Sequence, residues 1–441
     1  MTDHASLQVS PKEGFLRVVT SFAEATGKAL GLGKAEALAL TLSAEEVFTH
    51  LCRVVPPEGE RVEVRCSEKG YCVQVDFLFP AVDFDMRTFN ITTTVSLRDE
   101  ADFDRMGLLL ASRSVDRFLM AKENGRRLRL SLVKEKVYPP VEVGRPLEAK
   151  PLETFFLKIP DAEELKLFAE LVATAFDERD LPDFFGYPGK LADMVRGGGY
   201  RAVLAMGSGG EIGGGALWHW IGSRSVEWLG PYTFSQRDGS PMPKALLERC
   251  IADVARTPAV ALVSRFPVPG LSLESFEYLG SLRVRSPDGT SFFREARARL
   301  LQEDPGSVTW AHPTMEEFLR GEYRRLVLPR EVRVVKDRGE GHSPHAVLFT
   351  AFDRPRGSVF LEPVWFGEDF LQVLGQHLDL FRREGMLNVF FHMDAGCSWQ
   401  ASFAPGLLAN GLEPRYVLPY GGEGDVVVFQ LDPEREGGKD S

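Results

Sequence analysis

The sequence predicts a protein of the α/β class, in its α+β form, that is divided into several modules. The chain has 441 residues, which is too long for one hydrophobic core and suggests about two to four domains. Stretches with helical and with strand-like apolar spacing follow one another along it. One strand–helix–strand pattern occurs twice in the second half, which indicates an internal duplication.

Proline-rich and polar segments set the predicted boundaries between modules. Four prolines between Tyr138 and Pro151 exclude a helix or a central strand, so this segment is predicted to be a linker. A second boundary is predicted near Asp304-Pro305-Gly306. The expected modules are residues 1–137, 152–303 and 304–432, joined by the linker 138–151 and followed by a charged, disordered tail over 433–441.

Composition excludes some classes of binding partner and indicates the cellular compartment. A net charge of −11 argues against broad binding to nucleic acid or to anionic membranes. The N-terminus is polar and no apolar run is long enough for a transmembrane helix, so neither a signal peptide nor a membrane span is expected. The five cysteines are scattered and odd in number, which fits reduced thiols in a cytoplasmic protein without a metal site.

The first module is predicted to contain helices and a small set of strands. Asn124-Gly125 is a dipeptide typical of a tight hairpin turn, and strand-like segments flank it. Apolar spacing predicts helices over 15–26, 34–55 and 104–118, and strands over 61–65, 71–79, 118–122 and 128–133.

Glu46 and His50, on the second predicted helix, belong to the first of three motifs that carry a family resemblance. The segment Leu42-Ser-Ala-Glu-Glu-Val-Phe-Thr-His50 resembles the N-box helix of the histidine-kinase-like ATPases, in the subclass of anti-sigma-factor serine kinases. That family has a Glu followed four residues later by an Asn that helps to hold Mg²⁺ and phosphate. Glu46 matches the Glu, but His50 replaces the Asn, and imidazole is a poor ligand for a hard cation. The alternative interpretation is an i,i+4 polar pair on a helix face.

The other two motifs differ more from the family pattern. Val73–Phe79 resembles the strand that ends in Asp-x-Gly in these ATPases. In this register Phe79 replaces the Asp that recognises the adenine amino group, and Ala81 replaces the Gly. Asp104–Leu108 resembles the Gly-x-Gly-Leu loop, of which only Gly107 remains.

The resemblance implies a Bergerat-type α/β sandwich over about residues 10–137 with a degenerate nucleotide site at Glu46, His50, Phe79 and Gly107. Binding of ATP–Mg²⁺ is therefore not expected. A scaffold that has lost its ATP site is most often a binding module, and the anti-sigma relatives bind sigma factors and antagonist proteins. A regulatory protein partner of this type is expected, and a purely structural domain is the alternative.

The repeat in the second half is carried by two hexapeptides. Leu229-Gly-Pro-Tyr-Thr-Phe234 and Leu361-Glu-Pro-Val-Trp-Phe366 share a Leu-x-Pro-x-x-Phe pattern at the end of a predicted strand. A short helix that ends on glycine, at Gly280 and at Gly411, is predicted later in each copy. In each copy a predicted helix and then an apolar strand lie between the hexapeptide and this short helix. The helix covers 244–256 in the first copy and 370–383 in the second, and the strand covers 259–263 and 387–391.

The first copy carries a second resemblance. An amphipathic helix over 161–176, strands over 200–206 and 214–220, and a central strand over 226–234 resemble the elements of the GNAT acetyltransferases. In that family a Gln/Arg-x-x-Gly-x-Gly/Ala loop then enters a helix, and its backbone N–H groups hold the pyrophosphate of acetyl-CoA. Gln236-Arg-Asp-Gly-Ser-Pro241 stands at this point.

The resemblance therefore implies an acyl-CoA pyrophosphate loop that contains Gln236, Arg237, Gly239 and Ser240. Pro241 occupies the last small position and has no N–H to donate, although proline suits the first turn of a helix. An ordinary strand-to-helix turn is the alternative interpretation of this loop.

Acetylation of an amine needs a base for the amine and often an acid for the departing thiolate. Glu227 on the central strand is the candidate base, and a solvent-facing strand residue is the alternative. The family's tyrosine acid lies four residues before the glycine that closes the fourth helix. That position corresponds to Phe276, which has no proton to give.

The second copy departs further from the pattern. Phe366-Gly-Glu-Asp369 leaves no room for a phosphate loop, and Glu368 and Asp369 would repel phosphate, so this copy is expected to be structural. The sequence as a whole predicts a regulatory signalling protein, in which a partner-binding module is fused to a tandem GNAT-like unit whose first copy binds acetyl-CoA. The alternative is an active N-acetyltransferase that acts on a protein or an amine.

Overall fold

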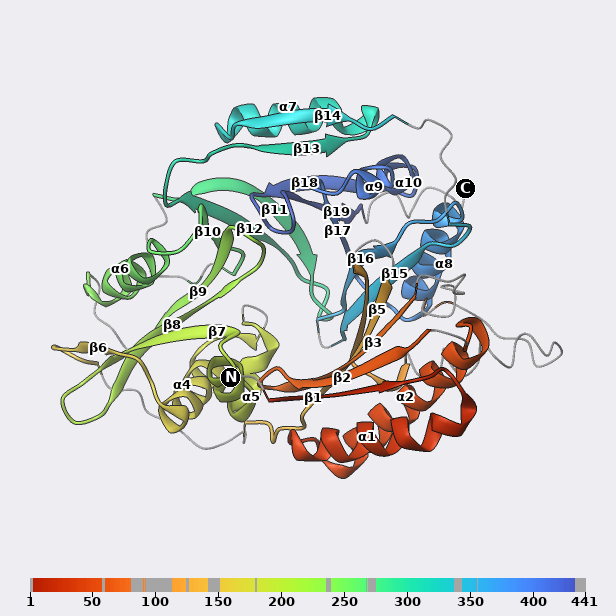
Figure 1. Ribbon diagram of the computed structural model, residues 1–441. Helices are drawn as coiled ribbons and strands as arrows, with labels where there is room; N and C mark the ends of the chain where they lie inside the picture. Colours follow the sequence, from red (N-terminus) through yellow and green to blue (C-terminus); the bar gives the residue numbers. More distant parts are fainter. Residues whose placement is uncertain are drawn as a thin grey trace. The chain divides into compact units, whose positions relative to one another are not determined.

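The structure is a computed structural model that combines helices with several β-sheets, which confirms the α+β class (Figure 1). It divides into two compact units. The first contains residues 1–137, 340–351 and 361–384, and the second contains residues 138–339, 352–360 and 385–441. The residues described are 3–57, 60–80, 90, 92, 113–123, 127–141, 151–178, 181–234, 239–266, 268, 275–336, 343–354 and 356–432.

The N-terminal part of the first unit is a five-stranded antiparallel sheet covered by two helices. The helices are α1 (Leu16–Ala29), which follows the short 3₁₀ helix η1 (Glu13–Phe15), and α2 (Lys34–Val54). The strands run in the order β1-β2-β3-β5-β4 and are β1 (His4–Val9), β2 (Val62–Glu68), β3 (Cys72–Pro80), β4 (Arg117–Glu123) and β5 (Arg127–Glu135).

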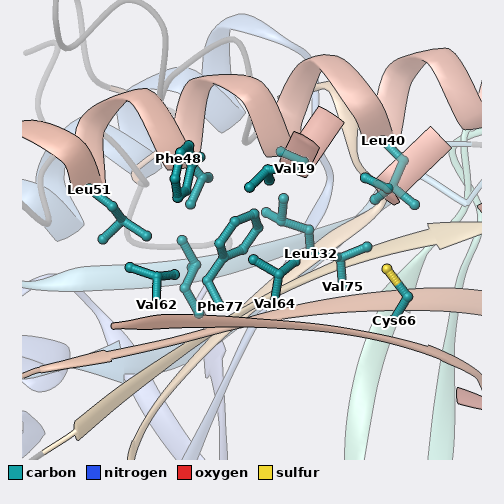
Figure 2. Close-up of a cluster of buried hydrophobic side chains, with 14 of the residues drawn as sticks. Val19, Leu40, Phe48, Leu51, Val62, Val64, Cys66, Val75, Phe77 and Leu132 are labelled. Carbon is teal, nitrogen blue, oxygen red and sulfur yellow. The ribbon is translucent and has the colours of Figure 1, made fainter. Parts of the chain in front are cut away.

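Alternating apolar residues of the strands form the core with the helices. Figure 2 shows Val19, Leu40 and Phe48 of the helices above Val64 and Phe77 of the sheet. All five side chains are fully buried, because every second strand residue points to the helical face. Burial of this apolar face is the main source of stability of the sandwich.

The expected helices over 15–26 and 34–55 and the expected hairpin are confirmed by α1, α2, β4 and β5. Strand β1 was not predicted. The helix expected over 104–118 extends too far, because residues 117 and 118 already belong to β4. Residues 104–112, which include Gly107, and the turn residues Asn124 and Gly125 lie outside the described residues.

The second unit is built on a seven-stranded sheet of order β11-β12-β10-β9-β8-β7-β6. Strands β9 and β10 are parallel, and the other neighbours are antiparallel. The strands are β6 (Phe156–Lys158), β7 (Tyr200–Met206), β8 (Ile212–Trp220), β9 (Ser225–Thr233), β10 (Ala261–Ser264), β11 (Glu277–Arg285) and β12 (Ser291–Leu300).

Helices of the first copy lie between these strands in the chain. Asp161 and Glu164 form a capping box at the start of the first of them, which fixes where the helix begins. They are α4 (Ala162–Ala175), η4 (Asp183–Gly186), α5 (Pro188–Arg196) and α6 (Met242–Val254). The predicted helices over 161–176 and 244–256 and the predicted strands over 200–206, 214–220, 226–234 and 259–263 are confirmed.

The second copy repeats the element order of the first. Its five-stranded sheet has the order β15-β16-β17-β19-β18, which matches β8-β9-β10-β12-β11, and a helix joins β16 to β17 as α6 joins β9 to β10. The elements are β13 (Ser307–Ala311), η5 (Pro313–Met315), α7 (Glu316–Arg325), β14 (Arg330–Val334), β15 (Val347–Asp353), β16 (Ser358–Trp365), α8 (Phe370–Arg383), β17 (Asn388–Asp394), α9 (Ser398–Ala401), α10 (Ala404–Ala409), β18 (Leu412–Leu418) and β19 (Val426–Leu431). Strands β13 and β14 form a separate parallel pair.

One predicted element of the repeat is wrong. Gly411 directly follows α10 and its capping residue, as expected, but Gly280 lies inside strand β11. The helix predicted to end at Gly280 is therefore absent at that position, and the assignment of Phe276 by counting back from it loses its basis. The structure shows why a glycine is needed there. A Cβ at Gly280 would lie 2.7 Å from both the Arg415 carbonyl oxygen and the Tyr416 Cβ.

Two buried carboxamides of the second copy bind the outer edge of β11. Gln430 accepts from the Arg283 N–H at 3.1 Å and donates to its carbonyl at 2.5 Å. Asn388 accepts from the Arg285 N–H and donates to its carbonyl, both at 2.8 Å. Because β11 ends the seven-stranded sheet, these side chains satisfy backbone groups that no neighbouring strand pairs.

The start of the predicted linker belongs to the second unit and is packed within it. The Tyr138 hydroxyl donates to Asp193 at 2.7 Å, and the Val141 N–H donates to the Gly186 carbonyl at 2.9 Å. Residues 142–150 and the tail 433–441 lie outside the described residues. Near the second predicted boundary, Asp304 is buried, whereas Glu303 and Pro305 on either side of it are exposed.

Candidate functional site

The parallel strands β9 and β10 form a fork. They pair over three residues only, from Ser225 opposite Ala261 to Glu227 opposite Val263. Strand β9 continues from Trp228 to Thr233 beyond the last of these pairs, and helix α6 begins a short loop later. Open α/β sheets bind ligands where neighbouring strands diverge, so the fork is the candidate site of the first copy.

Glu227 sits at the base of the fork and is buried. Arg265, just after β10, donates to it twice, from Nε and Nη2 to the two carboxylate oxygens, both at 2.7 Å. His219 Nε2 on β8 lies 3.0 Å from the same carboxylate, and the Tyr200 ring stacks on the imidazole with centroids 4.3 Å apart. Burial alone would raise the pKa of Glu227, but the Arg265 charge and the bonds from His219 and Arg265 lower it to about 2.

This environment does not favour the role of general base that the sequence suggested for Glu227. A base needs a free oxygen and a pKa near the working pH, whereas both Glu227 oxygens are already bound. The alternative interpretation, a solvent-facing strand residue, does not describe it either, because its side chain is 3% exposed. Its geometry is that of an acceptor that fixes the orientation of Arg265 and His219.

Tyr232, on the same strand, is a second polar group in an apolar setting. Its ring lies edge-on to Phe176 and Phe185, at centroid distances of 5.4 and 4.9 Å. The residue is fully buried, and its hydroxyl has no hydrogen-bond partner among the residues that the structure describes. An unsatisfied buried hydroxyl costs about 1–3 kcal/mol, so this atom is a candidate contact for a bound polar group.

The loop that enters α6 is described in part. Gly239 has φ +81°, which favours glycine, and a Cβ there would meet no atom within 4 Å. The Ser240 hydroxyl accepts from the Met242 N–H at 3.3 Å, and Pro241 stands at the start of the helix. Gln236 and Arg237, the other two predicted pyrophosphate contacts, lie outside the described residues.

The second copy connects β16 to α8 through residues 366–369 alone. The Asp369 carboxylate accepts from the Ala346 N–H at 2.6 Å and from His345 Nδ1 at 2.8 Å. It makes no side-chain hydrogen bond to the described N-terminal turn of α8. Asp369 therefore holds the segment before β15 and does not cap its own helix.

The residues of the predicted degenerate nucleotide site are dispersed between core and helix face. Phe79 is fully buried in the core of the sandwich. Glu46 and His50 lie one turn apart on α2 and are partly exposed. Burial and the neighbouring Glu45 raise the pKa of Glu46. Of the fourth residue, Gly107, the structure describes nothing.

Arg265, His219 and Tyr232 were not singled out from the sequence. One signal for Arg265 was available, since it follows the apolar strand 261–264 directly and functional residues concentrate at the carboxyl ends of strands. No such signal marks His219 or Tyr232, because their roles depend on which strand residues share a face.

Three general features of the described residues bear on function. No described helix combines the length and the apolar character needed to cross a membrane. Among the same residues, no group of three or more His, Cys, Asp and Glu side chains is arranged to hold a metal ion. The five cysteines, at positions 52, 66, 72, 250 and 397, are all free thiols.

Comparison with known proteins gives similarity over about a third of the chain. No protein-family model matches the sequence, and no curated protein matches it. Among solved structures, a GNAT superfamily phosphinothricin acetyltransferase from Sinorhizobium meliloti in complex with acetyl-CoA is 20% identical, over 34% of this chain and 90% of its own, with a TM-score of 0.29. A protein from Salmonella typhimurium named as an acetyltransferase, with its cofactor acetyl-CoA, is 16% identical over 34% and 96%, with a TM-score of 0.29. An N-acetyltransferase from Staphylococcus aureus is 14% identical over 34% and 100%, with a TM-score of 0.28.

Proposed function

We propose that the first copy binds an acyl-CoA and transfers its acyl group to an amine. The observation that carries this proposal is the fork between β9 and β10, in which β9 runs on past the last pair and leads, through a loop that contains Gly239, into α6. A helix N-terminus that follows a glycine turn is suited to a phosphate group. The open edge of β9 offers backbone groups to an extended chain such as pantetheine.

The residues present fit such a ligand in part. Gly239 supplies the turn and leaves space, and the Tyr232 hydroxyl has no partner within the described ranges, so a bound polar atom could supply one. Pro241 removes one N–H from the cradle, which would weaken phosphate binding by about 1.5–3 kcal/mol. In the reaction the neutral amine nitrogen attacks the thioester carbonyl, a C–N bond forms and the C–S bond breaks. The thiolate of CoA leaves, and the proton that the nitrogen loses passes through solvent to this thiolate.

Titration of the full chain with acetyl-CoA tests this function. We expect saturable binding by calorimetry, and release of free CoA thiol once an amine acceptor is added. Desulfo-CoA serves as the control for binding through the nucleotide end alone. Absence of saturable acetyl-CoA binding at millimolar concentration would contradict the proposal.

A second proposal concerns the N-terminal module, for which we propose a regulatory role through binding of a sigma factor or of a sigma-factor antagonist. The observation that favours it is a pair of apolar side chains on one face of α2. Leu38 and Leu42 are 54% and 50% exposed and lie one helical turn apart. An exposed apolar pair of this kind is suited to a protein partner.

Binding of purified sigma factors to the full chain tests the second proposal. We expect Leu42→Asp to weaken the complex strongly, because a carboxylate would be desolvated at the contact. Leu167→Asp, at a leucine of α4 that is 38% exposed, is the matched control. Equal affinity of both variants, or no binding by the parent, argues against this surface.

A further inference from the structure

Arg265 presents one edge of its guanidinium that the fold does not use. Its Nε and Nη2 atoms are bound to Glu227, whereas Nη1 makes no hydrogen bond to any residue that the structure describes. A quarter of the side-chain surface, 25%, is exposed. Because two parallel bonds to Glu227 fix the plane of the guanidinium, the N–H groups of Nη1 are held in place for an anionic oxygen.

The register of the sheet shows what lies beside Arg265. The last pair of β10 with β12 is Ser264 opposite Arg297, so the next step along both strands brings Arg265 level with Ala296. Ala296 in turn pairs with Gly280 of β11. Both neighbours in this row are small, so neither of them carries a side chain long enough to cover the guanidinium.

These residues share one face of the sheet. Val263 is paired with Glu227 on one side and with Ala298 on the other, and paired residues point the same way. Ala296 lies two positions from Ala298 and therefore points to the same face. Arg265 must also point there, since it reaches the Glu227 carboxylate.

The second copy fills the end of this row with a phenol. A Cβ at Gly280 would lie 2.7 Å from the Tyr416 Cβ, so β18 is in direct contact with the row at that point. Tyr416 is 2% exposed. Burial raises the pKa of Tyr416, the charges of Arg265 and Arg294 lower it and the charge of Glu227 raises it, to about 12 in all. The hydroxyl therefore stays protonated at neutral pH. It has no hydrogen bond to the described part of the chain.

We propose that Arg265 of the first copy and Tyr416 of the second copy together bind a carboxylate group of the acceptor molecule. A guanidinium N–H and a phenol O–H are two donors, which suits the two oxygens of a carboxylate. Glu227 already neutralises part of the Arg265 charge, so a singly charged carboxylate matches the site better than a dianionic phosphate. The substrate class is thus an amine that also carries a carboxylate, such as an amino acid or a peptide. Calling this ligand the acceptor rests on the acyltransferase function proposed above.

Binding of matched acids and amides to the full chain tests the inference without acetyl-CoA. The probes are the proteinogenic amino acids and short dipeptides, each compared with its own C-terminal carboxamide by calorimetry. At least one acid is expected to bind, and to bind more tightly than its amide. Tyr416→Phe should lower the affinity for that acid by roughly 10- to 100-fold, the usual value of a hydrogen bond to a charged group, and should leave the affinity for the amide unchanged.

Tyr278→Phe is the control, since Tyr278 lies on β11 and is 42% exposed. Arg265→Lys, which keeps the positive charge beside Glu227, should also lose the preference for acids, because an ammonium lacks the second edge. Equal binding of acids and amides, no binding of any acid, or an unchanged preference in Tyr416→Phe would each overturn the inference. Failure of acetyl-CoA to bind would contradict the acyltransferase function and leave the preference for acids standing.

Discussion

Arg265 and Arg330 both lie in the second unit and both pair with carboxylates, yet they differ in what remains unused. Arg330 has no exposed side-chain surface, and all its nitrogens donate, to Asp425 at 2.7 and 3.2 Å, to Asp304 at 2.8 Å and to the Pro329 carbonyl. The rings of Tyr420 and Tyr323 lie 4.5 and 5.9 Å from its guanidinium. Arg265 uses one edge and exposes the other.

The difference teaches how to distinguish a structural arginine from one that is available to a ligand. A guanidinium with no exposed surface whose three nitrogens all donate to the fold is out of reach of a ligand, and its removal leaves two buried carboxylates without their cation. A guanidinium that is fixed on one edge and open on the other is pre-organised for recognition.

The largest effect is expected from Arg330→Met. The substitution leaves Asp304 and Asp425 buried without their cation, and breaking a buried pair in this way costs about 3–5 kcal/mol. The midpoint of urea unfolding should fall accordingly. Arg333→Met is the control, because its partner Glu331 is 63% exposed and such surface pairs are worth about 0–1 kcal/mol. An equal fall of the urea midpoint in the two variants would show that the buried Arg330 contributes no more to stability than an exposed arginine.

The Glu227–Arg265 pair should make stability depend on pH in the acid range. The pKa of Glu227 is lowered to about 2 in the folded chain, so its contribution to the free energy of unfolding is fully present above the unfolded pKa of about 4.5. It is lost as the pH falls from there toward 2 and amounts to roughly 3 kcal/mol.

The measurement compares the free energies of unfolding of the parent and of Glu227→Gln between pH 5 and pH 2. The variant should be less stable than the parent at pH 5 and should lose less stability on acidification. Glu295→Gln is the control, because Glu295 also pairs with an arginine, Arg297, but is 43% exposed. If the parent and Glu227→Gln lose the same amount of unfolding free energy between pH 5 and pH 2, the Glu227 carboxylate is not held in its charged form by Arg265.

A smaller effect, on ligand binding alone, distinguishes the two strand-to-helix loops. Gly239→Asp places a side chain at φ +81° and a negative charge at the predicted pyrophosphate site, so acetyl-CoA binding should fall by at least tenfold. Glu368→Ala, in the corresponding loop of the second copy, should leave it unchanged. Calorimetric titration of both variants measures this. Binding by Gly239→Asp at the parent's affinity would place the acyl-CoA elsewhere.

Much of the fold could be predicted because it depends on local patterns. Helix α8 follows from the 3.6-residue spacing of its apolar residues, and the duplication follows from two hexapeptides. Strand β1 was missed because its only marked features are Leu7 and Val9 alternating with polar residues in an exposed edge strand. Gly280 was misjudged because glycine ends helices and also permits close approach of two strands, and sequence does not distinguish these uses.

The candidate site could be predicted less well than the fold. Glu227 was found from its place on the central strand, but its environment depends on Arg265 and His219, which the sheet register brings to the same face. Tyr416 is contributed by the other copy, so no pattern within the first copy points to it. Site chemistry here depends on long-range packing, which local spacing does not encode.

The smallest expected signal is that of ATP–Mg²⁺, which we expect not to bind to the N-terminal module. In the register that the sequence resemblance predicts, Phe79 takes the place of the Asp that recognises adenine, and a phenyl ring, here buried in the core, accepts no hydrogen bond. In the same predicted register His50 replaces a magnesium-binding amide, and imidazole suits this cation poorly. Titration of the full chain with ATP–Mg²⁺ should therefore give no saturable heat under conditions in which acetyl-CoA does. Low-micromolar binding of ATP that Glu46→Ala abolishes would show that this module has a working nucleotide site.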